Sequence, residues 1–243
     1  MRRIRPFLYL ITLLVMVSAV MNLDVSIKQG VGASYRYVHM PLYVKWTQFL
    51  ARHYEYARLV KEITRYCKTD EEKVLAVLNW TREHIRDVPK DMPVVDDHIL
   101  NIIIRGYATP GQYQDVFTTL CTYAGIPAFW DRCYSDNHKI RYALSFVKIG
   151  GKWGVFDAYR GKYFRKNNGE IAAIEDIIDN SSLLKGEDLD KILVRGIPYR
   201  EFYHNLQHVE KPSTSRAEKQ MPVRRVIFEA KKLVGIEIEE SDQ

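Results

Sequence analysis

The chain has 243 residues, enough for one medium domain with additional segments or for two small domains. Its 47% apolar and 27% charged residues, with 13 Gly and 9 Pro, exclude a mostly disordered, collagen-like or low-complexity protein. The 36 basic side chains are mixed with 30 acidic ones, so the net charge of +6 predicts a mixed surface and no nucleic-acid partner.

The amino terminus has the pattern of a membrane-inserting segment. Three arginines within the first five residues precede an uncharged, mostly apolar run over residues 6–23, which ends before Asp24. Val17-Ser18-Ala19 would suit signal cleavage, but the apolar character continues beyond it, which favours an uncleaved anchor. We therefore expect residues 1–23 to be a signal-anchor or transmembrane segment that places the rest outside the cytoplasm, periplasmic or at the cell surface. If the segment is cleaved, the protein is secreted.

The next elements are a linker and two helices. Residues 24–34 are polar and contain glycine, which predicts a short linker. Apolar and aromatic residues recur at spacings of three and four over 43–67, which predicts an amphipathic helix. Thr69 precedes three acidic residues and an apolar run, so a second helix is expected over 70–85. We assign 24–68 to the linker and first helix, and the start of the main domain to 69.

Helices then give way to strands. A short helix is expected over 96–105, and a longer one over 112–123 after the turn Thr109-Pro110-Gly111. Residues 131–141 are predicted to be a polar connection. Two strands, 142–149 and 153–159, flank Gly150-Gly151 as a hairpin, and 163–164 would add a third strand. This order predicts an α+β fold.

The remaining chain is less regular. We expect a helix over 171–178, a further element over 187–194 and a linker over 211–220. Residues 223–234 predict a basic amphipathic helix, which either packs on the domain with a solvated basic face or lies on an anionic membrane or a partner. The main domain is thus assigned to 69–200, and a C-terminal linker and helix to 201–243.

Two stretches, 69–85 and 111–157, resemble the transglutaminase-like superfamily, whose members share the papain-like cysteine-protease fold. The matching residues include Gly111, Asp115, Gly125-Ile126-Pro127-Ala128, Trp153 and Asp157, in the family's order. The resemblance implies a catalytic Cys two residues after Gly111, a His opening a strand, and an Asp ending the next strand.

The resemblance places tyrosines at two of these three positions. Tyr113 stands where the nucleophile is expected and Tyr142 where the His is expected, while Asp157 matches the residue that orients the His. A phenol with a pKa of about 10 cannot replace a thiol activated at a helix N-terminus. The degenerate triad therefore predicts no catalytic residues of this type.

Other residues could still form a site. The cleft-lining candidates are Gln112, Tyr113, Asp115, Tyr142 and Asp157; the two tyrosines either fill the vacated space or line a groove that binds a ligand. Cys133 with His138 is the alternative catalytic pair, whereas Cys121 is expected to be a buried small hydrophobe. No metal-ligand spacing is present, and no cofactor is expected.

Three functions follow as hypotheses. The first is a membrane-anchored, catalytically inactive transglutaminase-like domain that acts in binding or scaffolding outside the cytoplasm, with a protein, peptide or polysaccharide ligand and membrane contact through residues 6–23. The second is an active cysteine hydrolase or acyltransferase that uses Cys133 and His138. The third is a structural subunit of an envelope assembly.

Overall fold

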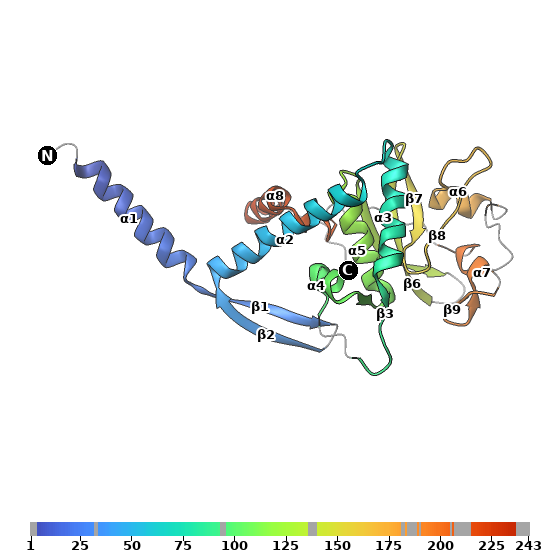
Figure 1. Cartoon of the computed structure of the whole chain (residues 1–243), viewed down its shortest axis with the longest axis horizontal. Helices are drawn as coiled ribbons and strands as arrows, with labels where there is room; N and C mark the ends of the chain where they lie inside the picture. Colours follow the sequence, from blue (N-terminus) through green and yellow to red (C-terminus); the bar gives the residue numbers. More distant parts are fainter. Residues whose placement is uncertain are drawn as a thin grey trace.

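The computed structural model describes residues 4–31, 34–92, 96–135, 140–180, 183, 189, 191–204, 206 and 215–236. Within them, helices pack on both faces of a four-stranded antiparallel sheet, which confirms the predicted mixture of helices and sheet (Figure 1). A long helix and a β-hairpin extend from this body towards the amino terminus.

The first helix, α1 (Ile4–Met21), projects away from the body (Figure 1). Its large apolar side chains from Phe7 to Val20 are 41% to 73% exposed. Among the residues that the structure describes, no helix combines the length and apolar character needed to cross a membrane. The membrane segment over residues 6–23 stays a prediction.

The linker predicted over 24–34 is wrong, because this stretch belongs to a β-hairpin. Strand β1 (Asp24–Val31) pairs with β2 (Ser34–Pro41) in antiparallel register, with Ile27 opposite Val38. Exposed and half-buried residues alternate along most of β1, the period expected of a strand with one covered face. The polar residues of β1 are thus its exposed side, and they concealed the strand.

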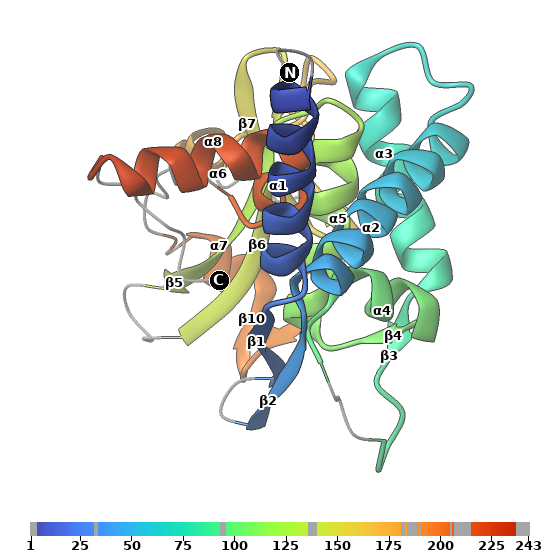
Figure 2. The ribbon, with the colours of Figure 1, turned by 90° about the vertical axis from the view of Figure 1, so that its left-hand side faces the viewer.

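Four helices confirm the predicted helical segments. They are α2 (Leu42–Ile63), α3 (Asp70–His84), α4 (Ile99–Arg105) and α5 (Pro110–Tyr123). Every residue of α5 from Gln112 to Thr122 is buried. A helix covered on all sides lies inside the domain rather than on its surface. Figure 2 shows α2, α3 and α4 on one side of α5 and β6 on the other.

The sheet has the order β5-β6-β7-β8. Its strands are β5 (Ala128–Ser135), β6 (Ile140–Ile149), β7 (Lys152–Asp157) and β8 (Lys162–Tyr163). The hairpin around Gly150-Gly151 and the third strand are confirmed. The predicted connection over 131–141 is wrong where the structure describes it, since 131–135 belong to β5 and 140–141 to β6.

Smaller elements complete the chain. Strand β3 (Arg86–Asp87) pairs in parallel with β4 (Tyr107–Ala108), and β9 (Leu193–Val194) pairs antiparallel with β10 (Ile197–Pro198). The predicted helix at 171–178 is α6 (Ile174–Asp179), and α7 (Tyr199–His204) follows β10. Of the predicted linker at 211–220, residues 211–214 lie outside the described residues and Glu218–Gln220 form a 3-10 helix. The basic helix is confirmed as α8 (Pro222–Leu233).

Two apolar clusters hold the body together. One joins α5 to α2, α3 and α4 around fully buried residues such as Tyr56, Val77 and Phe117. The other, on strands β5 to β7 with α6 and α7, includes Phe146, Val155 and Phe202. Burial of each such side chain is worth about 1.5–3 kcal/mol relative to exposure. The sheet therefore lies between two cores, and α5 is the central helix of the first.

The start of α3 gives a test of this local structure. The Thr69 hydroxyl accepts the Glu72 backbone N–H at 3.1 Å, and Glu72 accepts the Thr69 N–H at 3.1 Å. We expect Thr69→Ala to lower the free energy of unfolding by about 1 kcal/mol, because it removes this cap. Urea unfolding followed by circular dichroism measures the change. Thr47→Ala, on the exposed part of α2, is the control, and an equal loss there would contradict the capping role.

Candidate site at the start of α5

The turn Thr109-Pro110-Gly111 positions the candidate site. Pro110 occupies the first turn of α5, where its missing N–H costs nothing. The Thr109 N–H donates to the Gln112 side-chain oxygen at 3.0 Å. This helix start lies at the edge of the sheet near β5 and β6, and it presents the positive end of the α5 dipole there.

Tyr113, at the position predicted for the nucleophile, points away from the other triad positions. Its side chain is 1% exposed, and its hydroxyl donates to the Ile85 carbonyl at 3.0 Å, with Asp87 Oδ1 at 3.4 Å. Burial, together with the nearby Asp87, raises the pKa of Tyr113 to about 12. The hydroxyl thus stays protonated and ties α5 to the end of α3.

Asp157 is fully buried at the end of β7, and donors from four parts of the chain surround it. The hydroxyls of Tyr142 and Tyr199 donate to Oδ2 at 2.6 and 2.8 Å. The Arg160 backbone N–H and the Gln114 amide donate to Oδ1 at 3.0 and 3.5 Å. The Arg160 guanidinium lies 3.4 Å from Oδ2. Two predicted triad positions, Tyr142 and Asp157, therefore meet, and Tyr113 does not join them.

Burial is the dominant influence on the Asp157 carboxyl. It raises the pKa of Asp157 to about 6, although the hydrogen bonds from Tyr199, Arg160 and Gln114 act in the opposite direction. Gln114 is itself fixed, since its side-chain oxygen accepts the Ser145 hydroxyl at 2.6 Å and the Ala158 N–H at 3.2 Å. The carboxyl is thus held in one geometry by α5, β6 and α7.

Gln112 and Asp115, the other cleft candidates, are both buried and bonded elsewhere. The Gln112 amide donates to the Asp97 carboxylate at 2.6 Å. Asp115 accepts the Trp130 indole N–H at 2.9 Å and pairs with Arg216 at 3.0 Å. Burial raises the pKa of Asp115 to about 6, against the influence of Arg216. Both side chains therefore hold α5 against the segments around it.

None of the three cysteines is bonded to another cysteine. Burial raises the pKa of the Cys121 and Cys133 thiols, whereas an activated thiol needs a lowered pKa. Cys133 is 2% exposed and lies on β5 opposite Tyr142. Its predicted partner, His138, lies outside the described residues. No group of three metal-ligating side chains occurs among the residues that the structure describes.

A cavity of about 660 Å³ lies over the start of α5, and we call it the basic cleft. Thr109, Pro110 and Gly111 line it from the helix, and Tyr142 and Tyr159 contribute aromatic side chains. Four arginines surround it: Arg132 on β5, Arg141 on β6, Arg160 after β7 and Arg195 after β9. Of the residues predicted to line a cleft, Tyr142 lies among those that line this cavity. Asp157 lies behind Tyr142, whose hydroxyl donates to it.

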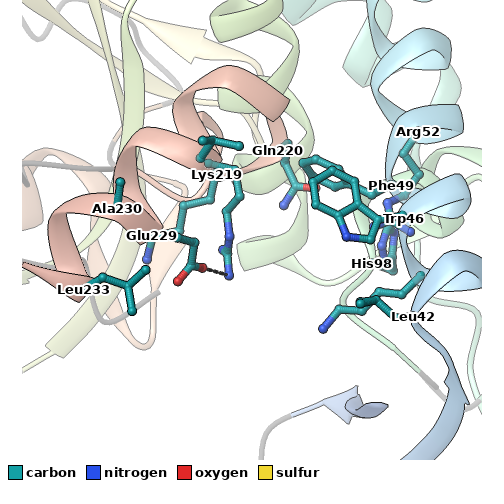
Figure 3. Close-up of a pocket in the computed structure, with 13 residues that line it drawn as sticks. Leu42, Trp46, Phe49, Arg52, His98, Lys219, Gln220, Glu229, Ala230 and Leu233 are labelled. Atoms are coloured by element: carbon teal, nitrogen blue, oxygen red, sulfur yellow. Dashed lines mark ion pairs between the residues drawn. The ribbon is translucent and has the colours of Figure 1, made fainter. Parts of the chain in front are cut away.

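A second cavity, of about 610 Å³, separates α2 from α8 (Figure 3). Trp46 and Phe49 of α2 face Ala230 and Leu233 of α8 across it. An ion pair between Arg225 and Glu229 lies along α8 at 2.5 Å. This groove is mainly apolar and lies apart from the triad positions.

Three of the groups that hold Asp157 were not predicted from the sequence. Gln114 lies next to the expected nucleophile position, and Arg160 three residues after Asp157, so proximity to those positions was an available signal. Tyr199 lies 42 positions from Asp157, beyond the stretch that carries the family resemblance. Nothing in the local pattern around Tyr199 indicates this contact.

One family of known proteins matches the part of the chain that contains α5 and Asp157. Residues 57–158 match the family described as the Transglutaminase-like superfamily, so these residues form a transglutaminase-like domain. The match begins within α2 and ends just after β7. None of the curated proteins matches the sequence.

Two solved structures are similar to the chain. A candidate cysteine protease from Cytophaga hutchinsonii is 21% identical over 44% of this chain and 38% of its own, with a TM-score of 0.39. A candidate protease from Parabacteroides distasonis is 13% identical over 55% of this chain and 35% of its own, with a TM-score of 0.36. The chain therefore spans less than two fifths of either structure's length.

The buried carboxyl predicts a pH-dependent stability. Because the pKa of Asp157 is about 6 in the folded chain and about 3.9 when unfolded, folding takes up a proton between these values. The protonated Asp157 carboxyl therefore contributes to the free energy of unfolding fully below about pH 4, and this contribution is lost as the pH rises through about 6. Relative to Asp157→Asn, the wild type should lose roughly 2 kcal/mol of unfolding free energy from about pH 4 to 7. Urea unfolding of both proteins measures this difference, and a relative gain by the wild type would contradict it.

Proposed function

We propose that this chain is a catalytically inactive transglutaminase-like domain that acts in binding or scaffolding outside the cytoplasm and is tethered to a membrane by its N-terminal segment. The proposal rests mainly on the hydrogen bonds that the two tyrosine hydroxyls at the triad positions donate. Tyr113 donates to the Ile85 carbonyl, and Tyr142 donates to Asp157. Both groups serve as fixed hydrogen-bond donors, a structural role that needs no thiol.

The environment of the thiols also supports inactivity. Nucleophilic catalysis by cysteine needs a thiolate that substrate can reach, commonly at a helix N-terminus or beside an imidazole. Cys121 lies deep in α5 and Cys133 is covered by the second apolar cluster, with the pKa of each raised by burial. The alternative of a relocated Cys133–His138 pair would need Cys133 to become exposed first.

The basic cleft favours a binding role over the alternative in which the two tyrosines only fill the space at the triad positions. Tyr113 and Tyr142 fill space near the triad positions, but a cavity of about 660 Å³ still lies beside Tyr142. Ligand sites in proteins commonly have volumes of 300–1,000 Å³. A domain that keeps such a cavity without an activated nucleophile is suited to bind a ligand without transforming it.

The apolar surface of α1 supports the membrane tether. Its large side chains are exposed, and α1 packs only at its end against the rest of the chain (Figure 1). Such a surface in water would be costly, at about 25 cal/mol per Å² of apolar area. Arg2, Arg3 and Arg5, which precede the apolar run, favour an orientation with the domain outside the cytoplasm.

Inactivity predicts a definite pattern of thiol labelling. Iodoacetamide at neutral pH should modify the half-exposed Cys67 of the native protein and leave Cys121 and Cys133 unmodified until the chain is unfolded. Intact-mass spectrometry reads the labelling, and Cys67→Ser should remove it. Rapid labelling of Cys133 that slows only below about pH 6 would contradict the proposal. So would amide hydrolysis or acyl transfer that disappears in Cys133→Ser.

The tether predicts a charge-sensitive membrane association. Leu10→Arg with Leu14→Arg should move the protein from the membrane fraction to the soluble fraction, because each buried cation at mid-membrane costs about 2.5–3.5 kcal/mol. Leu50→Arg, at an exposed leucine of α2, is the control and should stay with the membrane. Flotation of cell membranes measures the partition. A wild-type protein found in the soluble fraction would contradict the tether.

A further inference from the structure

The described side chains that line the basic cleft include basic groups but no acidic ones. Among the described residues that line it are four arginines and no carboxylate or side-chain amide. The other polar side chains are the hydroxyls of Thr109, Tyr142 and Tyr159 and the indole of Trp130. Tyr142, Tyr159 and Trp130 already donate to Asp157, Asp87 and Asp115. The arginines therefore supply most of the donors and the positive charge of the lining, which is poor in acceptors.

One of the four arginines is held in place. The Arg160 guanidinium lies 3.4 Å from Asp157 Oδ2 and donates to the Leu193 carbonyl at 3.1 Å. Its centre lies 4.8 Å from the Tyr142 ring and 5.5 Å from the Tyr159 ring, so two aromatic faces support it. An arginine fixed on several sides loses little entropy when it binds a ligand, and this makes it a preformed anchor.

The other three arginines lie outside the ion pairs that the structure describes. Arg132, Arg141 and Arg195 are exposed, and none forms an ion pair with a carboxylate in the described part of the chain. Arg195 also has a φ of +48°, a left-handed conformation that costs a side-chain-bearing residue about 1–2 kcal/mol. This backbone places Arg195 at the tight turn between β9 and β10, beside the cleft.

The charge balance of the cleft stays positive even when Asp157 is ionised. Asp157 offsets Arg160, and Asp115 is paired with Arg216. Three guanidinium groups around one cavity, next to the positive end of α5, repel cations and attract anions. Neutral sugars fit this lining poorly, because their hydroxyl groups also need acceptors, and the cleft offers few.

We propose that the basic cleft binds a ligand that carries at least two anionic groups, carboxylate or phosphate. Guanidinium groups bind both through paired N–H donors. Arg160 would hold one group at the cleft floor, while Arg132 and Arg141 on neighbouring strands would hold the second. This inference rests on the proposed function, because it names the ligand class of a cleft that binds without catalysis.

The test is calorimetric titration of the full-length protein in a nonionic polyoxyethylene detergent. Pyrophosphate and citrate serve as the two anionic probes and separate phosphate from carboxylate as the recognised group, and maltotriose serves as the neutral probe. We expect at least one anion to bind at low salt, with an affinity that falls as ionic strength rises, and maltotriose not to bind. Arg132→Gln with Arg141→Gln should weaken the anion affinity by about tenfold or more.

A control with the same change in net charge separates the cleft from the general charge of the protein. Arg36→Gln with Arg65→Gln removes two exposed arginines outside the cleft and should change the affinity less than about twofold. Equal weakening in both double variants, binding of maltotriose, or no binding of either anion would overturn the inference. Inactivity would survive each of these results, because it fails only if a cysteine-dependent turnover or an activated thiol is found.

Discussion

The arrangement around Asp157 is the interaction on which the rest of the molecule depends. A carboxyl with no exposure to water is costly unless its oxygens are bonded. Here the donors come from α5 through Gln114, from β6 through Tyr142 and from α7 through Tyr199. One side chain thus connects the central helix, the sheet and the helices on the far face. Loss of a single donor would leave the buried Asp157 carboxyl with an unsatisfied oxygen, which is costly.

The same arrangement links the two apolar clusters. Asp157 follows Phe156, which packs with Phe117 in the first cluster, while Tyr199 and Tyr203 belong to the second. The Tyr203 hydroxyl lies 3.2 Å from that of Tyr199, so the polar contacts continue into the second core. The basic cleft lies beside this bridge. Its shape therefore depends on both halves of the domain.

The sequence was sufficient for the central helix and the hairpin. Thr109-Pro110-Gly111 indicated the start of α5, and Gly150-Gly151 indicated the turn, since local conformational preferences decide both. Strands β1 and β5 were missed because each has an exposed face rich in polar residues. In β5 the buried Cys133 and Ser135 alternate with the exposed Arg132 and Tyr134, a signal present in the sequence. Tyr199 could not be placed, because its partner lies far away in the chain and no local pattern encodes that distance.

The contacts of Tyr113 limit which side chains this position can accommodate. It satisfies the Ile85 carbonyl and fills buried volume next to Tyr159. A cysteine at this position would be too short to reach that carbonyl, and it would leave a void as well as an orphaned acceptor. On the proposed function, a Tyr113→Cys change would thus not by itself create a working nucleophile, because the surroundings fit the larger side chain and other positions would have to change with it.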